Sequence, residues 1–293
     1  MPSLKQITTK IKSVRGTRRI MSAMKLIAAV KLQRSQSILS SYRPYSDAYK
    51  DVVFNVASKL EPEDHALLRK PENKNRLHLV FLTSDRGLCG SFNSTLIRNV
   101  ENYIKSDLTD FNDIKISFIG RRGKEYFSNA DHEIGKFYIG ANEKNFVQIA
   151  NEIASSLTDE FKNEETDEIV LAYNYFLSAL SQEMTFEKIL PLEIEKDEEE
   201  EGSSDYIFEP EKTELVDSIL PKYIQVRIER AINESLTSEH AARMTAMENA
   251  TSNADEVIRK LTLLFNKTRQ AMITTELMDI VNGTEAQKKG GNE

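Results

Sequence analysis

The chain has 293 residues, of which 40% are hydrophobic and 29% charged, and its formal net charge is −7. It has no run of about 18 apolar residues, which excludes a membrane-spanning helix, and its single cysteine, Cys89, excludes an internal disulfide framework and fits a reducing compartment. Residues 1–46 carry ten Lys and Arg and no Asp or Glu, so the net charge divides into +10 for this segment and −17 for the rest. A basic segment on an acidic body indicates a partner for this end of the chain.

Residues 1–60 have the apolar spacing of a long helix. Apolar residues recur at steps of three and four from Leu4 to Leu32, and Arg18 interrupts the stripe. Pro44 removes one helical hydrogen bond, so we expect a kink or a local break there. An acid-free N-terminus with Ser and Arg is also typical of a mitochondrial transit peptide, but a stripe that continues past residue 30 argues against a removable leader.

The middle of the chain has a different rhythm. Residues 61–75 are polar, contain two prolines and are expected to form a linker. Residues 76–192 then alternate between the patterns of strands and helices, which predicts a parallel, doubly wound, Rossmann-like α/β domain. The expected strands are 77–82, 114–119, 134–139 and 169–176, and the expected helices are 93–106, 124–129 and 145–161.

An acidic stretch, residues 193–210, follows this domain and is expected to be a solvated loop, because it holds eight acidic residues between Glu193 and Asp205. Residues 211–283 are then expected to form the last helix. Pro221 suits a first helical turn, so the helix should start near it, and Gly283 suits the residue after its end. Residues 284–293 are expected to form a flexible tail.

The last helix carries a coiled-coil pattern. Its apolar positions from Met247 to Met278 have a mean step of about 3.5 residues. A helix of the N-terminal kind is marginal in water without a tertiary partner, and the last helix is the obvious one. The two terminal helices are therefore expected to pack as a long antiparallel coiled coil.

The sequence gives little support for catalysis. Gly87-Leu88-Cys89-Gly90 follows an expected strand but lacks the G-x-G-x-x-G spacing, and only two residues separate Gly120 from Gly123, which a P-loop does not allow. The four histidines show no metal-ligand spacing. We therefore predict no catalytic, cofactor-binding or metal site, and we interpret Cys89 as a small residue that fills a strand–turn–helix joint.

The basic N-terminal segment could in principle bind nucleic acid or a membrane surface. It has no aromatic residue before Tyr42 to stack on bases, and no Trp or Phe to anchor it in a bilayer. Neither nucleic-acid binding nor direct membrane insertion is therefore expected, and a helix that faces a protein partner is the better interpretation. The alternative that stays open is a basic coiled-coil scaffold, or a nucleic-acid-binding protein, with a non-catalytic α/β domain.

Five stretches of the chain resemble the gamma subunits of bacterial-type rotary F-type ATP synthases. They are Ser13–Met24 with Ala28–Lys31, Arg43–Tyr45, Thr83–Asn93, Ser238–Met247 and Asn266–Leu277. They occur in the family's order and span essentially the whole chain. The resemblance implies a coiled coil with an α/β domain that acts as a non-catalytic central rotor shaft. Such a shaft couples proton or other ion flow through the membrane sector to ATP synthesis or hydrolysis at the alpha–beta ring by asymmetric rotating contacts.

The resemblance also implies partners and a location. Three alpha and three beta subunits would surround one copy, and the epsilon subunit and the membrane ring of c subunits would contact the α/β domain. The match begins almost at Met1, which leaves no room for a transit peptide, so we expect the cytoplasmic face of a bacterial plasma (inner) membrane. The paired regulatory cysteines of chloroplast members are missing, so thiol control is not expected. The tail 285–293 extends past the family's usual end.

Finally, the resemblance implies contact residues. Arg269, Gln270, Thr274 and Glu276 correspond to polar contacts with beta-subunit loops, and Met24 lies where the shaft passes an acidic lever of the beta subunit. A charged shaft face near Met24 would complement that lever; it consists of Lys10, Arg15, Arg18 and Arg19. The sequence does not determine the driving ion, the number of ring subunits, the favoured direction or the mode of inhibition.

Overall fold

The computed structural model describes residues 3–58, 65–71, 74–108, 111–128, 132–192 and 212–290. The chain divides into two compact units. The helical unit comprises residues 1–27 and 246–293, and the sheet unit comprises residues 28–245. Two long helices, α1 (Leu4–Ala57) and α5 (Lys212–Gly290), contribute to both units. The boundary between the units therefore lies within the helices and not in the segment 61–75 that was expected to be a linker.

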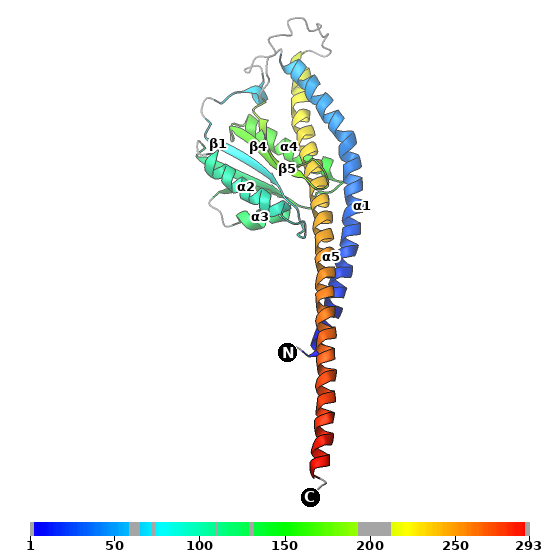
Figure 1. Cartoon of the computed structure of the whole chain (residues 1–293). Helices are drawn as coiled ribbons and strands as arrows, with labels where there is room; N and C mark the ends of the chain where they lie inside the picture. The colour runs from blue at the N-terminus through cyan, green and yellow to red at the C-terminus, as the bar shows by residue number, and fades with distance from the viewer. Residues whose placement is uncertain are drawn as a thin grey trace. The chain divides into compact units, whose positions relative to one another are not determined.

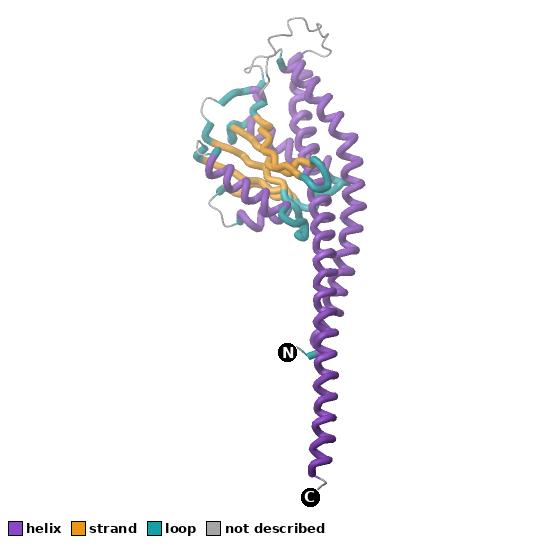
Figure 2. The backbone as a smooth tube through the Cα atoms, viewed as in Figure 1, coloured by secondary structure: helices purple, strands orange, loops and turns teal. Residues whose placement is uncertain are grey.

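The sheet unit holds one sheet (Figures 1 and 2). It has five strands in the order β3-β2-β1-β4-β5. Neighbouring strands among the first four are parallel, and β5 is antiparallel to β4. This mixed sheet confirms the predicted α/β fold class. The strands are β1 (Arg76–Leu82), β2 (Asp113–Ile119), β3 (Glu133–Tyr138), β4 (Glu168–Phe176) and β5 (Gln182–Leu190).

Helices cover both faces of this sheet. Helices α2 (Phe92–Ser106) and α3 (Arg121–Phe127) pack on one face, and α4 (Phe146–Lys162) packs on the other with the parts of α1 and α5 that belong to the sheet unit. Successive side chains of a strand point to opposite faces, so Leu79 and Val80 of β1 enter different cores. Because both faces are buried, β1 reads as a continuous apolar run.

In the helical unit, α1 and α5 pair antiparallel. Arg18 contacts Asp255 and Lys25 contacts Glu248. Residue numbers therefore increase by seven along α1 where they decrease by seven along α5. The expected antiparallel coiled coil is confirmed here. The best covered seam positions of α5 are Met247, Ala254, Ile258, Leu261, Phe265 and Thr268.

The same orientation holds inside the sheet unit, where α1 and α5 also lie side by side (Figure 1). Arg43 contacts Glu234 and Asp47 contacts Arg230, a step of four in opposite directions. Several seam positions of α1 here are small: Ser35 and Ser46 are completely buried. Small seam residues allow two helices to approach closely but bury little apolar surface.

Both prolines lie inside helices, so the local break considered at Pro44 does not occur and the helix start expected near Pro221 was wrong. Helix α1 continues across Pro44 without a break, because its neighbours Arg43 and Asp47 are both tied to α5. Helix α5 begins at Lys212, so Pro221 lies inside it and not near its start. Packing explains the earlier start, since Val216 and Leu220 of the preceding turns are 2% and 0% exposed.

The end of α5 also differs from the expectation. Gly283 does not end the helix, which continues to Gly290. Gly283 has no atom near the position of an added Cβ and no left-handed φ, so its backbone simply propagates the helix. Residues 291–293 of the expected tail lie outside the described residues, as does the expected acidic loop 193–210.

Two elements of the sheet unit were missed from the sequence. The edge strand β5 follows the turn Ser178–Ser181 and pairs with β4. Within the segment expected to be a linker, a short 3-10 helix, η2 (Ala66–Leu68), places Leu67 in the core, where its carbonyl accepts from Leu192 N–H at 3.3 Å. Both elements are short and are stabilised by tertiary contacts that sequence periodicity does not report.

Two glycines with positive φ allow a controlled test of the sheet edge. Gly120 follows β2 with φ 99°, and a Cβ there would lie 2.0 Å from the Thr83 carbonyl oxygen. Gly140 has φ 74° and nothing within 4 Å of the same position. We expect Gly120→Ala to lower the free energy of unfolding by more than about 3 kcal/mol and Gly140→Ala by only about 1 kcal/mol. Urea unfolding followed by circular dichroism measures both, and equal losses would contradict the steric argument.

Candidate functional site

The basic residues expected on the shaft face differ in whether they already have a partner in the described part of the chain. Lys10, Arg15 and Arg19 are exposed and make no ion pair within the described part of the chain. Arg18 instead occupies a seam position, where its Nε donates to Asp255 Oδ1 at 2.6 Å. The structure therefore separates three free cations from one that α5 already neutralises. Met24 is half-buried near the same seam.

The acidic partners on α5 were not identified from the sequence. Arg18 pairs with Asp255 and Lys25 pairs with Glu248, and all four side chains remain between 36% and 52% exposed. Pairs of this exposure are worth only about 0–1 kcal/mol each, so they set the register more than they add stability. The sequence did hold a signal, since both the cations and the acids are seven residues apart, the coiled-coil repeat.

The second expected set lies where α5 has no helical partner. The register of the two ion pairs places Leu4, the first residue of α1, opposite about residue 269. Every residue from 269 to 284 is exposed, and we call this stretch the unpaired segment. The exposed large apolar residues of this segment are Met272, Ile273, Leu277, Met278, Ile280 and Val281.

All four of the expected polar contact residues lie in the unpaired segment. Arg269, Gln270, Thr274 and Glu276 are exposed, and the only hydrogen bond among them within the described residues runs from Thr274 Oγ1 to the Gln270 carbonyl at 3.0 Å. The two charged groups are 7 residues apart, about two turns of the helix. The segment thus presents apolar and charged side chains that nothing in the described chain covers.

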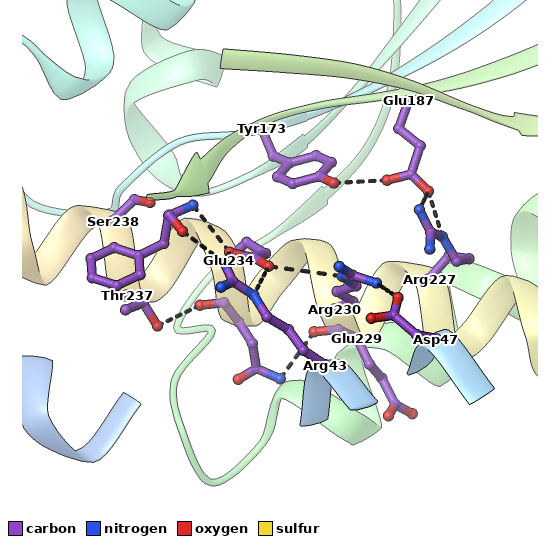
Figure 3. Close-up of polar contacts among 12 residues, drawn as sticks. Arg43, Asp47, Tyr173, Glu187, Arg227, Glu229, Arg230, Glu234, Thr237 and Ser238 are labelled. Carbon is purple, nitrogen blue, oxygen red and sulfur yellow. Dashed lines mark hydrogen bonds and ion pairs between the residues drawn. The ribbon is translucent and has the colours of Figure 1, made fainter. Parts of the chain in front are cut away.

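A buried polar cluster ties α1, α5 and β4 together in the sheet unit (Figure 3). Arg43 Nε and Nη2 each donate to one oxygen of Glu234 at 2.7 Å, and Nη2 also donates to the Phe176 carbonyl at 2.6 Å. Phe176 N–H donates to Glu234 Oε2 at 3.0 Å. We call these three groups, with Phe176 represented by its backbone, the Arg43 clasp.

The environment of the clasp makes it costly to break. Glu234 is 0% exposed, and Arg43 also stacks over the ring of Tyr175, with 4.6 Å between Cζ and the ring centroid. Its hydrogen bonds to Glu234 outweigh burial and raise the pKa of Arg43. Without Arg43, Glu234 would keep only Arg230, whose Nε lies 3.8 Å from Glu234 Oε1, and removal of one partner from a buried ion pair costs about 3–5 kcal/mol. The sequence motif around Arg43 was noticed, but its partner lies 191 residues away.

Further polar pairs surround the clasp. Arg227 donates to Glu187 of β5 at 2.5 Å, and Glu187 also accepts from the Tyr173 hydroxyl at 2.8 Å (Figure 3). Burial, the charge of Glu187 and this hydrogen bond raise the pKa of Tyr173. Arg230 pairs with Asp47 across α1 and α5. These polar pairs add to the apolar core that α1 and α5 share with the sheet.

Helix α5 also lies across the edge of the sheet where this fold class usually binds ligands. That edge is formed by the carboxyl ends of the strands, at the point where the strand order reverses, here between β1 and β4. Ser238 Oγ donates to the Asn174 carbonyl of β4 at 3.1 Å. Arg243 Nη2 donates to the carbonyls of Arg86 and Gly87 after β1 at 3.2 and 3.3 Å. A helix of the same chain thus takes the position that a nucleotide takes in other members of the fold class.

A buried histidine strengthens this contact. His240 Nε2 lies 3.0 Å from Glu143 Oε1, which precedes α4. Burial lowers the pKa of His240 to about 4, against the opposing effect of Glu143. His240 is therefore neutral at pH 7 and donates its Nε2–H to the carboxylate. Within the described residues, no cluster of His, Cys, Asp and Glu can hold a metal ion.

One set of residues has the hydrogen-bond order of a hydrolase triad. Ser117 Oγ lies 2.8 Å from His78 Nε2, and His78 Nδ1 lies 2.7 Å from Glu160 Oε2. Ser117 and His78 are only 3% and 2% exposed, and the Ser117 oxygen also accepts from Lys136 N–H at 2.9 Å. A cavity of about 250 Å³ nearby is lined by Lys115 and Glu160 but by neither Ser117 nor His78. The hydroxyl cannot meet a substrate there, so this is a structural network between β1, β2 and α4.

The chain is similar to known proteins over nearly its whole length. The family model described as ATP synthase matches residues 3–287. The ATP synthase gamma chain of Trichlorobacter lovleyi is 43% identical over 289 residues, which cover 98% of this chain and 100% of that one. The gamma chain of Geobacter metallireducens is 41% identical over 288 residues, with the same coverage.

Solved structures agree with this match. The central stalk and c-ring structure of the Tetrahymena thermophila mitochondrial ATP synthase has a chain with a TM-score of 0.60 and 25% identity, covering 79% of this chain and 99% of that one. A chain of the Euglena gracilis mitochondrial ATP synthase, in a structure of OSCP, F1 and c-ring, has a TM-score of 0.65 and 19% identity, covering 99% and 96%. The second likeness supports the fold alone. Within the described part of the chain, none of the helices is both long and apolar enough to cross a bilayer.

The network around His78 predicts a pH-dependent contribution to stability. Burial acts to raise the pKa of Glu160, but the hydrogen bond and charge of His78 and the charge of Lys115 outweigh it and hold the pKa at about 2, below the ordinary 4.5. The ionised carboxylate therefore stabilises the fold above about pH 4.5, and this contribution is lost as the pH falls towards 2. We expect Glu160→Gln to lower the free energy of unfolding by about 2–3 kcal/mol at pH 7 and by much less at pH 3.

Urea unfolding of parent and variant between pH 3 and 7 measures this difference. Glu152→Gln, at an exposed position on the same helix, is the matched control and should change stability by less than about 0.5 kcal/mol. A loss for Glu160→Gln that is the same at pH 3 and pH 7 would show that the carboxylate charge is not what stabilises the network.

Proposed function

The chain belongs to the family of ATP synthase gamma chains, and we propose that its paired terminal helices act as the central rotor shaft of an F-type ATP synthase. The observation that carries the proposal is the match to gamma chains over 98% of the sequence. As a gamma chain it is a non-catalytic subunit of the synthase complex. The unpaired segment supports the role, because it presents side chains that need surrounding partners.

The mechanism follows from symmetry. We propose that three alpha and three beta subunits surround α1 and α5, so that one asymmetric shaft stands inside a threefold ring. Such a shaft cannot contact three beta subunits in the same way. A contact that favours one conformation of a beta subunit by about 1.4 kcal/mol changes its relative population tenfold. As the shaft turns, each catalytic site in turn experiences each set of contacts, which couples ion flow to ATP synthesis or hydrolysis.

The proposed contacts with beta subunits lie on exposed positions. Arg269 and Glu276 offer charges, and Gln270 offers a side-chain amide, all without a partner among the described residues. The hydroxyl hydrogen of Thr274 is already used within α5, so it contributes through its oxygen. On α1, we propose that Met24 faces an acidic lever of the beta subunit.

The four residues of the proposed charged shaft face differ in whether their charge is already paired. Lys10, Arg15 and Arg19 are free to meet acidic groups of the ring. Arg18 keeps its family position, but its charge is already offset by Asp255, so we assign it to the register of the coiled coil and not to the ring contact.

The sheet unit is proposed to contact the epsilon subunit and the membrane ring of c subunits. The complex is membrane-bound and this chain is a peripheral part of it, which fits the finding that no described helix could cross a bilayer. Its bacterial relatives suggest the cytoplasmic face of a plasma membrane. Proton is the proposed coupling ion, with sodium as the alternative.

Co-purification tests the proposal. A tagged copy of the chain in its native cell should recover alpha and beta subunits in a ratio of three each per tagged chain, together with epsilon and c subunits. Native mass spectrometry gives the ratio directly. Recovery of the chain without alpha and beta subunits, from membranes that hydrolyse ATP, would refute the shaft function.

Variants of the unpaired segment test the proposed contact residues. Arg269→Ala and Glu276→Ala should lower ATP turnover of the assembled complex by at least about threefold, or ~0.7 kcal/mol in the barrier. They should change stability by less than about 0.5 kcal/mol, because both side chains are exposed. Arg98→Ala, at an exposed arginine of α2 in the sheet unit, is the control. Parental turnover in both variants would exclude these two residues as ring contacts.

A further inference from the structure

We propose that the Arg43 clasp is the joint through which turning force passes between the paired helices and the sheet unit, with Arg43 as its positioning residue. The inference rests on the proposed rotor function. A shaft couples two ends only if its helices do not slip relative to the domain on which they are mounted. The question is therefore which contacts fix α1, α5 and the sheet to one another.

The clasp is the place where all three elements meet in one set of hydrogen bonds. Arg43 comes from α1 and Glu234 from α5 (Figure 3). Phe176 comes from the end of β4. The guanidinium donates to both oxygens of Glu234 and to the Phe176 carbonyl, and the Phe176 N–H donates back to Glu234. These bonds form a closed ring, so no element can rotate or slide without breaking at least two of them.

The hydrogen bonds between Arg43 and Glu234 require a specific orientation of the two side chains. The planar guanidinium forms two parallel bonds with a carboxylate only in one relative orientation. An apolar seam has no such preference, because dispersion and burial change little when one side chain slides past another. The clasp therefore selects a single register of α1 against α5, as buried polar pairs do in other coiled coils.

Apolar packing around the clasp does not select the register in the same way. The small core cluster at this level contains only Leu32, Leu39, Phe176 and Ala241 as buried members. The neighbouring buried seam positions Ser35 and Ser46 are small and polar. The larger core of the sheet unit reaches the clasp from one side, because Ile232 and Leu236, which flank Glu234 on α5, belong to it.

Two ion pairs that flank the clasp also hold the helices and the sheet together. Arg230 links α5 to Asp47 of α1, and Arg227 links α5 to Glu187 of β5. Each of these joins only two elements. Glu234, by contrast, is completely buried and accepts hydrogen bonds from both α1 and β4. Loss of the clasp should therefore weaken the attachment of the two helices to the sheet more than loss of either flanking pair.

The experiment uses the whole complex in proteolipid vesicles. Arg43→Lys keeps the positive charge but lacks the planar guanidinium that donates two parallel hydrogen bonds. Glu234→Gln keeps the side-chain shape but lacks the negative charge. The double variant Arg43→Met with Glu234→Met removes both charges together. Arg34→Ala, an exposed arginine on the same helix and in the same unit, is the matched control. Two quantities are measured: ATP hydrolysis by the detached alpha–beta–gamma assembly, and protons pumped per ATP hydrolysed against an imposed proton gradient.

We expect hydrolysis by the detached assembly to stay within about twofold of the parent in every variant, since the clasp lies outside the helical unit that carries the proposed ring contacts. Protons pumped per ATP should fall at least about threefold in Arg43→Lys and Glu234→Gln, and the loss should grow with the imposed gradient. The double methionine variant should recover the thermal stability of the parent, as apolar replacements of buried pairs often do, but not its pumping. Arg34→Ala should match the parent in both measurements.

The outcomes separate the possible failures. Parental pumping in all three clasp variants, or pumping restored in the double methionine variant, overturns the proposal, because packing alone would then suffice. The proposal is also overturned if a variant lowers the hydrolysis rate of the detached assembly by the same factor as the rate of proton pumping. The residues would then act on the ring of alpha and beta subunits. If the parent chain forms no complex with alpha and beta subunits, the rotor function itself fails, and the assembly step detects this before any variant is compared.

Discussion

Two helices that come from opposite ends of the chain bury their apolar stripes against each other, and in the sheet unit also against the sheet. Neither stripe is strong alone, since α1 is interrupted by Arg18 and contains Pro44, and α5 contains Pro221. Their antiparallel pairing satisfies both, and it brings Asp255 to the arginine that interrupts the seam. The position of every other element in the sheet unit depends on this pairing, because the sheet packs on a surface to which both helices contribute.

The α/β domain shows how a ligand-binding fold can serve as a mount. In this fold class the carboxyl ends of the strands usually form an open crevice. Here α5 lies across them, and Ser238 and Arg243 satisfy carbonyls of β4 and of the loop after β1. The hydrogen-bonding groups of the crevice are used to hold a helix in place. This accounts for a Rossmann-like pattern in a sequence without a phosphate-binding loop.

Local periodicity was enough to predict the strands β1 to β4, the long helices and their pairing. It failed where tertiary contacts outweigh local preference. Pro221 suggested a helix start, but the burial of Val216 and Leu220 extends α5 beyond it. The partner of Arg43 could not be found, because Glu234 lies 191 residues away and nothing local distinguishes it from the other acids of α5. The ion pairs of Arg18 and Lys25 could have been predicted from the sequence, because the two cations on α1 and the two acids on α5 each have the seven-residue spacing of a coiled coil.

The unpaired segment shows what kind of partner the chain requires. An isolated helix of this length is marginal in water, and six large apolar side chains are exposed between Met272 and Val281. At about 100° per residue these side chains spread around the helix and do not form one stripe. A single partner helix would cover only one side, so these apolar side chains need partners on several sides. A surrounding ring of subunits meets this requirement, and contacts on every side are also what a turning shaft needs in order to act on each subunit in succession.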